Sequence, residues 1–566
     1  MSNTTSRHLR RRAHSAALVL LVVATSGCQL PSWLVGAVAE AEPEVPVTTP
    51  APPPQPVPTS TITPPTTTPP TPSTTTPTTA PPTTGPPTTT PTPASALTLC
   101  STGTASGPSD PPSGAVTIPV GSDPSAITGA HGAGTTYWFA RGTHTPSAAI
   151  DAQAGDRFLG APGAVLDGGF AGIAAFTGGG AGVTIRGLTI QRFGTTDGRG
   201  WVNGAAINRS VAARWTVEDN TIRLNDGNAL FLGDGSTTRR NCFSENGQTG
   251  LAAPAQQRSG GYISLTGIVV TGNEIRGNNR NDIESAPGAC TGCTGGMKLW
   301  QTTGAIVSGN TVVDNHGVGI WLDNNNVDAL VDDNIVAGND REGIMVETSY
   351  NSRVTNNVVT GNAVVDGRRR SGSFPIAGVF ISNSGGSPRL AGTVGIEVSG
   401  NRIEDNWNGV VVFWDADRYC GSASDTSVGH CTLGGATLAS CATQVEQPPS
   451  PDAFVENCHW GSVGVSVHDN EFVTSAALVA GCNGRCGRNG LIASAAPAST
   501  RVRLADGTVR TVRNPLGPDW ARERVVDPGT NRFWSNRYSG SWRFDLRSPG
   551  QTLTGEAWRG TGQDAA

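Results

Sequence analysis

The stretch that decides the fold is "NHGVGIWLDNNNVDALVDDNIVAGNDREGIMVETSYNSRVTNNVVTGN", residues 315–362. Short segments of alternating apolar residues are separated by glycine and asparagine, and no ten-residue helical pattern occurs. Asn310, Asn334 and Asn357 lie 24 and then 23 residues apart, which indicates a repeat of that length. One such unit cannot bury an apolar face by itself, so the units must stack on one another.

The same pattern continues in both directions from this stretch. Segments similar to "GNTVVDN" recur between residues 219 and 473, and units continue into a second short strand such as "GMKLWQ" (296–301) or "GIWLDN" (319–324). The repeat predicts an all-β fold, a parallel β-helix in which each unit makes one coil. The repeated asparagines would then line up at one corner, where Asn tolerates left-handed backbone angles and its amide can bond along a ladder.

Composition separates the N-terminal part of the chain from the repeat. The 566 residues include 74 glycines and 40 prolines, more than an ordinary globular protein contains. Residues 1–28 have a basic start and an apolar run too short to span a membrane, which predicts a signal peptide. The run ends at Cys28 in "ATSGC", similar to a lipoprotein cleavage site, so lipidation of Cys28 and plain secretion both stay open. Residues 29–99 are rich in threonine and proline and predict a disordered stalk.

The β-helix is expected over residues 100–490, with a cysteine-rich insertion at 415–465. Residues 491–566 lose the asparagine repeat and gather aromatic residues, so we expect them to form a β-rich cap over the end of the solenoid.

Ten of the eleven cysteines follow Cys28, and an even number in an exported protein predicts disulfides. Cys290 and Cys293 share the short loop "CTGC", and Cys482 and Cys486 share "CNGRC", so we expect these four cysteines in disulfides. Zinc is the alternative for "CTGC", but no second pair follows at the spacing of a zinc finger.

Residues from about 115 to 490 resemble the right-handed parallel β-helix repeat proteins of the pectin-lyase-like superfamily, and among them secreted actinobacterial proteins of unassigned activity. That superfamily includes pectate lyases, polygalacturonases, alginate lyases and mannuronan epimerases, so the resemblance implies an extracellular polysaccharide as partner. The motifs of these enzymes are mostly missing: the polygalacturonase Gly-His-Gly is represented only by "NHGVG", and no Asp-Pro-His element of the epimerase type occurs. The fold therefore does not decide the reaction.

Alternation along the second strands predicts which side chains face outward. Ile320 and Leu322 would point into the coil, and Trp321 and Asp323 away from it. Aligning the second strands on their leading glycines predicts two outward columns. The first consists of Lys298, Trp321, Met345 and Phe380, and the second of Trp300, Asp323, Glu347 and Ser382.

Two features of these columns suggest a site. Asp323 and Glu347 would be like charges on adjacent coils, which repel unless one is protonated or a cation or an arginine lies between them. Lys298 is the only lysine among 39 lysine and arginine residues, and a lysine can lose its proton where an arginine cannot. The alternative is that these side chains have no functional role, because outward-facing charges on a solenoid usually only keep its surface hydrated.

The candidates for catalysis are Lys298, Asp323, Glu347 and His316, acting as acid and base or holding a divalent cation such as calcium; no cofactor is certain. The candidates for substrate binding are the sugar-stacking Trp300 and Trp321, with Arg341 and Tyr350 on nearby turns.

The predicted function is an exported or surface-anchored protein that binds and processes an extracellular polysaccharide, as a lyase or epimerase before a hydrolase. A non-catalytic solenoid that binds glycan or protein is the alternative. We expect a monomer that contacts a membrane only through the possible lipid anchor. The net charge of −5 and the scattered arginines exclude a nucleic-acid partner.

Overall fold

The structure is a computed structural model that describes residues 95–565, with gaps. The gaps are residues 173, 195–203, 208–213, 254–255, 259–260, 284–293, 370–374, 387–394, 423–430, 434–436, 448 and 504–507. The predictions for the signal peptide, Cys28, most of the stalk, Cys290 and Cys293 lie outside the described residues. In the described part, no helix has the length and apolar character needed to cross a membrane.

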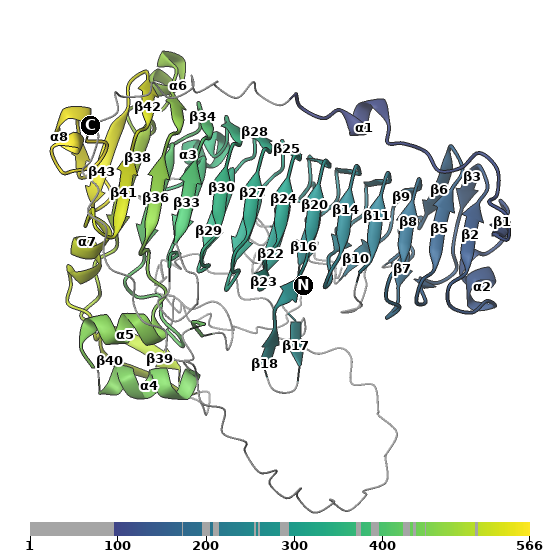
Figure 1. Ribbon diagram of the computed structural model, residues 1–566, viewed down its shortest axis with the longest axis horizontal. Helices are drawn as coiled ribbons and strands as arrows, with labels where there is room; N and C mark the ends of the chain where they lie inside the picture. Colours follow the sequence, from purple (N-terminus) through teal and green to yellow (C-terminus); the bar gives the residue numbers. More distant parts are fainter. Residues whose placement is uncertain are drawn as a thin grey trace, which may run out of the picture. The chain divides into compact units, whose positions relative to one another are not determined.

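Three long sheets, which we call A, B and C, form the β-helix, and their strands lie side by side in the order of the coils (Figure 1). Neighbouring strands are parallel throughout, except for the last pair of sheet C, which is antiparallel. A complete coil contributes one strand to each sheet. The predicted all-β parallel β-helix is therefore confirmed.

The strands of sheet A are β1 (Val116–Ile118), β2 (Thr136–Phe139), β5 (Arg157–Gly160), β8 (Thr184–Arg186), β11 (Thr216–Glu218), β14 (Thr237–Arg239), β20 (Val269–Thr271), β24 (Ile306–Ser308), β27 (Leu330–Asp332), β30 (Arg353–Thr355), β33 (Ile396–Ser399), β36 (Val465–His468) and β41 (Asn531–Trp534). Those of sheet B are β3 (Gly142–His144), β6 (Ala164–Asp167), β9 (Thr189–Gln191), β12 (Thr221–Arg223), β15 (Cys242–Ser244), β21 (Glu274–Arg276), β25 (Thr311–Val313), β28 (Ile335–Ala337), β31 (Val358–Thr360), β34 (Arg402–Glu404), β37 (Glu471–Val473) and β42 (Arg537–Ser539). Those of sheet C are β4 (Ile150–Asp151), β7 (Phe176–Thr177), β10 (Ala205–Ile207), β13 (Asn228–Phe231), β16 (Leu251–Ala253), β22 (Gly295–Trp300), β26 (Val318–Asp323), β29 (Ile344–Glu347), β32 (Val379–Ser382), β35 (Val410–Trp414), β38 (Arg488–Ala493), β43 (Arg543–Arg547) and β44 (Thr552–Leu553).

Smaller elements lie outside these sheets. The short strand pairs are β17 (Gln256–Arg258) with β18 (Gly261–Ile263), β19 (Leu265–Thr266) with β23 (Thr302–Thr303), and β39 (Ser499–Arg503) with β40 (Val509–Arg513). The helices are α1 (Leu99–Thr102), α2 (Pro124–Gly129), α3 (Val364–Arg369), α4 (Leu438–Glu446), α5 (Pro451–Cys458), α6 (Ala476–Gly481), α7 (Trp520–Val525) and α8 (Gly555–Arg559).

A ladder of buried asparagines fixes the corner between sheets A and B. Asn310 Nδ2 donates to Asn334 Oδ1 at 2.9 Å, and Asn334 Nδ2 donates to Asn357 Oδ1 at 2.9 Å. Each amide also bonds to main-chain groups, for example Asn334 Nδ2 to Val307 O at 2.9 Å. The same corner position is occupied by Asn220, Asn241, Asn273, Asn310, Asn334, Asn357, Asn401, Asn470 and Asn536. The predicted alignment of Asn310, Asn334, Asn357 and Asn401 at one corner is thus confirmed.

One detail of the ladder differs from the expectation. The left-handed backbone angle falls on the residue before each ladder asparagine and not on the asparagine itself, as at Asp333 (φ 54°) and Asn356 (φ 56°). Gly309 (φ 61°) and Gly400 (φ 66°) occupy the same position in other coils. The bend of the chain therefore lies at the residue before each ladder asparagine, and the asparagine amide is free to bond its neighbours along the ladder.

The interior of the coils is filled by the inward residues of all three sheets. Ile320 and Leu322 are fully buried in this core, whereas Trp321 belongs to a separate apolar cluster outside the coil. The predicted alternation of inward and outward side chains on this strand is therefore confirmed.

The β-helix continues past the boundary expected at residue 490. Strands β41, β42 and β43 form one further coil, and Asn470 Nδ2 donates to Asn536 Oδ1 at 3.0 Å, so the asparagine ladder also continues. The boundary was wrong because residues 494–530 separate this last coil from the one before it and break the period. The end of the solenoid is covered only by the final residues, where Trp558 of α8 stacks on Phe544 with ring centres 4.9 Å apart.

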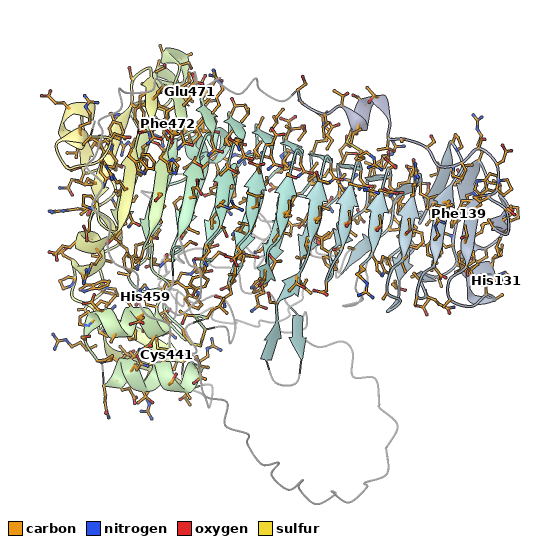
Figure 2. The ribbon with its side chains drawn as sticks, in the orientation of Figure 1. His131, Phe139, Cys441, His459, Glu471 and Phe472 are labelled. Carbon is orange, nitrogen blue, oxygen red and sulfur yellow. A yellow bond between two sulfur atoms is a disulfide. The ribbon has the colours of Figure 1, made fainter. Side chains whose placement is uncertain are left out.

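The insertion at 415–465 and residues 494–526 pack together, and we call them the accessory module. Tyr419 donates its hydroxyl to Thr500 Oγ1 at 2.7 Å, and Ser422 forms an antiparallel bridge with Val502. The disulfides Cys420–Cys431 and Cys441–Cys458 close two loops of the insertion. Figure 2 labels Cys441 and His459 in this part of the chain. Part of the segment expected to be a cap is thus a partner of the insertion.

The first described residues of the chain lie along sheet B. Leu97 N donates to Thr311 Oγ1 at 2.8 Å, and Cys100 N donates to Glu274 Oε2 at 2.8 Å. A disulfide joins Cys100 to Cys242 across a sequence separation of 142 residues. The chain that precedes the β-helix is therefore covalently attached to its middle coils.

Candidate functional site

Both predicted columns are present in sheet C. Lys298 pairs with Trp321, Trp321 with Met345, and Met345 with Phe380. The neighbouring column pairs Trp300 with Asp323, Asp323 with Glu347, and Glu347 with Ser382. The register predicted from the leading glycines is thus confirmed at every position.

The columns are nevertheless not exposed, contrary to the expectation of a solvent-facing patch. Asp323 is 5% exposed and Glu347 is 4% exposed. The accessory module explains the difference, because it lies over this side of the β-helix. Asn325, which lies just after β26, donates to Cys431 O at 2.9 Å and accepts from Trp460 Nε1 at 3.1 Å. Residues far along the chain therefore cover the side chains that alternation points outward.

Lys298 lies between a carboxylate and two indole rings. Its Nζ lies 2.9 Å from Asp323 Oδ2 and 3.7 Å from the centre of the Trp321 ring, and 5.7 Å from the centre of the Trp300 ring. An ion pair and an aromatic face both favour the charged ammonium over the neutral amine. This environment works against Lys298 as a base, which requires the neutral amine.

Glu347 is neutralised by an arginine that sequence analysis missed. Arg418 of the accessory module forms an ion pair with Glu347, and Trp321 Nε1 donates to Glu347 Oε2 at 3.1 Å. Burial raises the pKa of Glu347, and Arg418 opposes the rise. Burial lowers the pKa of Arg418, but Glu347 and Asp323 outweigh it, so this pKa is raised. The repulsion between Asp323 and Glu347 was expected to be relieved by protonation, a cation or an arginine. In the structure an arginine, Arg418, lies beside Glu347.

These four charges form a neutral set of two cations and two carboxylates, which we call the buried charge cluster. It consists of Lys298, Asp323, Glu347 and Arg418. Its carboxylates already have cationic partners, so the cluster gives no support to the divalent cation considered from the sequence. In the described part of the chain, the group with the spacing of a metal site is Cys420, Cys431 and Cys441, and these sulfurs are in disulfides.

The other predicted site residues lie apart from this cluster. The His316 side chain is 52% exposed, and its Nδ1 lies 3.1 Å from Asp340 Oδ2. Arg341 is buried, and its Nε lies 3.4 Å from Glu342 Oε2 and 3.9 Å from Asp366 Oδ2 of α3. The structure gives these residues local charged partners and does not bring them to a shared site.

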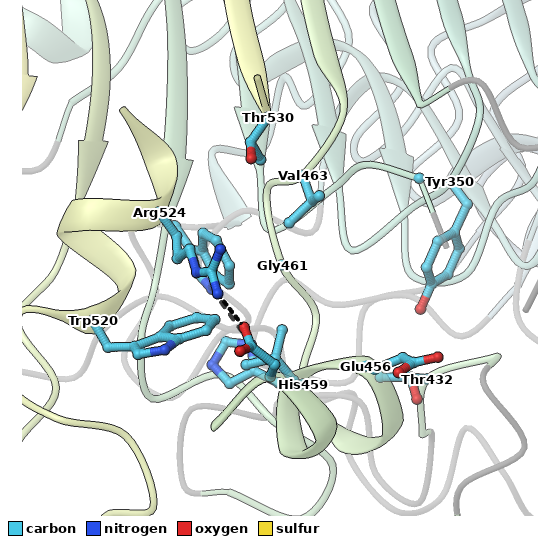
Figure 3. Close-up of a pocket in the computed structure, with 13 residues that line it drawn as sticks. Tyr350, Thr432, Glu456, His459, Gly461, Val463, Trp520, Arg524 and Thr530 are labelled. Carbon is cyan, nitrogen blue, oxygen red and sulfur yellow. Dashed lines mark hydrogen bonds and ion pairs between the residues drawn. The ribbon is translucent and has the colours of Figure 1, made fainter. Parts of the chain in front are cut away.

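Tyr350 lines a cavity of about 250 Å³ between the β-helix and the accessory module. We call it the α5–α7 pocket, because those two helices supply much of its wall (Figure 3). It is lined by Tyr350, Gly386, Trp414, Thr432, Asp452, Val455, Glu456, His459, Gly461, Val463, Trp520, Arg524 and Thr530. A residue predicted to bind substrate thus reaches a pocket, together with residues that the sequence did not suggest.

An aromatic platform and charged groups share one side of the pocket. Trp520 meets the buried Trp414 edge to face, with ring centres 5.4 Å apart. Arg524 lies 5.3 Å from the centre of the Trp520 ring and forms an ion pair with Asp452, which Figure 3 marks by a dashed line. Trp520 is partly exposed in the wall of the pocket.

Two uncharged groups complete the wall. Burial raises the pKa of Tyr350, so its hydroxyl stays protonated, and the main chain of Leu433 hydrogen-bonds to it. Burial lowers the pKa of His459, whose Nδ1 lies 2.7 Å from Trp460 O and whose Nε2 lies 3.2 Å from Ala416 O. His459 is therefore a neutral side chain, whose single N–H donates to one of these two carbonyl oxygens.

Most of the α5–α7 pocket could not be predicted from the sequence, because at least four separate segments build it. Trp520 and Arg524 were assigned to a cap, and Asp452 and Glu456 to a stapled loop. One signal was present: the insertion begins directly after β35, a strand of the same sheet as the predicted columns.

A family model described as a right-handed β-helix region matches residues 203–394. Among solved structures, the A-module of the mannuronan C-5 epimerase AlgE4 of Azotobacter vinelandii is similar, with 13% identity over 64% of this chain and 85% of that chain, and a TM-score of 0.38. PfbA, a surface adhesin of Streptococcus pneumoniae, is similar with 12% identity over 69% and 93% of the chains, and a TM-score of 0.31. At such identities these likenesses concern the fold and not the activity. Comparison with curated protein sequences gives no significant match.

The matched residues contain the coils that carry both predicted columns, and their strands belong to the three parallel sheets. Coil repeat, corner ladder and family match agree, and the chain forms a right-handed parallel β-helix.

Proposed function

We propose that the protein binds a polysaccharide and that the α5–α7 pocket holds one sugar residue of it. The observation that carries this proposal is the partly exposed Trp520 in the pocket wall, beside the charged groups of Arg524 and Asp452. A sugar ring has an apolar face that stacks on an indole and hydroxyl groups that bond to charged side chains.

The size of the pocket supports a small ligand unit. A volume of about 250 Å³ is below the range of roughly 300–1,000 Å³ that holds a drug-sized molecule. A single sugar residue with the rest of its chain outside is consistent with that size. The polysaccharide-acting superfamily that the repeat resembles supports the same class of ligand.

Binding is favoured over processing by the state of Lys298, Asp323 and Glu347, three of the four predicted catalytic residues. Lys298 is paired with Asp323, and Glu347 is paired with Arg418, all of them buried. A general acid or base needs access to the substrate and a proton that it can exchange. We therefore favour the non-catalytic alternative, a solenoid that binds a glycan. It includes export, which rests on the N-terminal sequence and is consistent with the disulfides.

The test is calorimetric titration of the full chain with a panel of neutral and acidic oligosaccharides. We expect one class to bind, and Trp520→Ala to weaken that binding at least tenfold, or about 1.4 kcal/mol. Trp534→Ala is the matched control, because it removes a partly exposed indole from sheet A, away from the pocket lining. Absence of binding across the panel, or an equal loss in both variants, would reject the proposal.

A further inference from the structure

The hairpin formed by β39 and β40 presents a second surface of the accessory module, distinct from the α5–α7 pocket. We propose that the outer face of this hairpin binds a linear anionic polymer. This inference does not rest on the sugar-binding proposal, since it concerns other residues and another kind of contact.

The register of the hairpin places three arginines on one face. In β39, Arg501 and Arg503 are exposed and alternate with the buried Thr500 and Val502. Residues directly opposite in an antiparallel pair share a face, and Arg513 lies opposite the exposed Ser499. Arg513 therefore belongs to the same outer face as Arg501 and Arg503, together with Ser499, Val509 and Thr511.

Among the residues that the structure describes, these arginines have no carboxylate partner of the kind that neutralises other arginines of the protein. In the described part of the chain, no ion pair involves Arg501, Arg503 or Arg513. On the opposite face of the same hairpin, Arg510 Nη1 lies 3.0 Å from Glu446 Oε1 of α4. The hairpin thus has one neutralised face and one cationic face, on a protein whose net charge is −5.

The spacing of the charges favours a polymer over a single small anion. Residues two apart on a strand are about 6.8 Å apart, and diagonal neighbours across the pair are about 7–8 Å apart. Both distances are within the Debye length of about 8 Å at physiological salt, so Arg501 repels Arg503 and Arg513 when no ligand is present. An anion that recurs along a chain relieves this repulsion, and a guanidinium can bind a carboxylate or a phosphate through two hydrogen bonds.

The composition of the face distinguishes this ligand from two others. Its members are Ser499, Arg501, Arg503, Val509, Thr511 and Arg513, with no aromatic side chain on which nucleic-acid bases could stack. Val509 is the single apolar side chain among them, which is too little to enter a lipid surface. A polyanion with carboxylates or phosphates on each unit matches the guanidinium groups and needs no apolar contact.

The experiment measures binding of the full chain to polygalacturonate and to inorganic polyphosphate by calorimetry at two salt concentrations. We expect at least one of these polymers to bind, with an affinity that falls as salt rises. The variant carrying Arg501→Ser, Arg503→Ser and Arg513→Ser should bind at least tenfold more weakly, with a smaller salt dependence. The two polymers separate carboxylate from phosphate as the preferred group.

Arg510→Ser is the matched control, to be compared with Arg503→Ser, since each removes one positive charge from the same hairpin on opposite faces. We expect Arg503→Ser to weaken binding severalfold and Arg510→Ser to change it less than twofold. Trp520→Ala should leave polyanion binding unchanged, which separates this inference from the proposed sugar site. Circular dichroism and an unchanged melting temperature establish that each variant is folded. Equal loss in the two single variants, no binding to either polymer, or tighter binding to single-stranded DNA or to anionic lipid vesicles would overturn the inference.

Discussion

Removing the Arg418 guanidinium should detach the accessory module from the β-helix. Arg418 belongs to the module and Glu347 to sheet C, and both side chains are less than a tenth exposed. In Arg418→Ala the carboxylate of Glu347 would stay buried without this cation, which costs about 3–5 kcal/mol. This cost destabilises the docked state of the accessory module, because Glu347 is solvated again when the module detaches.

Hydrogen exchange measures this docking locally, which suits a long chain whose parts need not unfold together. A reporter inside the module is the Cys420 amide, which donates to Cys458 O at 2.8 Å. If detachment is the route of exchange, a cost of about 3 kcal/mol accelerates exchange by roughly a hundredfold. Replacing both partners, as Arg418→Met with Glu347→Leu, should restore much of the protection, because a buried pair can be replaced by apolar residues at little cost.

An exposed pair in the same module serves as the control. The Asp452 and Arg524 side chains are 67% and 44% exposed, so Arg524→Ala should cost less than about 1 kcal/mol. The reasoning is refuted if Arg418→Ala leaves exchange within about threefold of the wild-type rate, or if Arg524→Ala has the larger effect.

The pH dependence of the Arg418→Ala variant gives an independent check. Burial raises the pKa of Glu347 above its ordinary value near 4.5, and loss of Arg418 removes a charge that opposes the rise. A carboxyl with a raised folded-state pKa contributes stability that is present below its unfolded pKa and is lost as the pH rises through the folded value. The variant should therefore dock better near pH 4 than near pH 7.

Three further predictions concern the corner ladder, the N-terminal disulfide and the histidine of the insertion. Asn334→Ala removes a buried amide that bonds in both directions along the ladder, and it should lower the free energy of unfolding by at least about 2 kcal/mol, measured in urea. Replacing Cys100 and Cys242 by serine opens a loop for which chain entropy sets an upper limit of about 5 kcal/mol, so the urea midpoint should fall, and a reductant, which also opens the other disulfides, should lower the wild-type midpoint at least as far. Burial lowers the pKa of His459 below its ordinary value near 6.5, so the stability it contributes is present above about pH 6.5 and is lost as the pH falls through the lowered pKa; the urea midpoint of the accessory module should fall in acid, and an unchanged midpoint would contradict this.

The sequence was sufficient to predict the β-helix because its period is carried by local residues. Glycine and asparagine recur at fixed distances, and this spacing determined the register of Lys298 on Trp321 and of Asp323 on Glu347. The same alternation correctly separated the inward Leu322 from its outward neighbours.

Burial of the columns could not be predicted, because it depends on residues distant in sequence. Arg418 is 71 residues from Glu347, and Trp460 is 135 residues from Asn325. Alternation along a strand tells which side chains leave the coil, but not whether another segment covers them. The last coil was also missed, because the excursion at 494–530 interrupts the period just before it.

The α5–α7 pocket could not be predicted from local sequence patterns for the same reason. Tyr350 was selected as a residue on a turn beside the columns, but Trp520 reaches the same pocket from 170 residues further along the chain. No repeat or motif links the two segments. Their proximity follows from packing of the accessory module, which sequence periodicity does not record.

Side-chain footprinting locates the bound sugar on the protein. The full chain is labelled oxidatively with and without an oligosaccharide that the panel has shown to bind, and labelled tryptophans are quantified by mass spectrometry. The account predicts that the ligand protects Trp520 and leaves labelling of Trp534 unchanged. Protection of Trp300 or Trp321 with Trp520 still fully labelled would contradict it and return the site to the predicted columns.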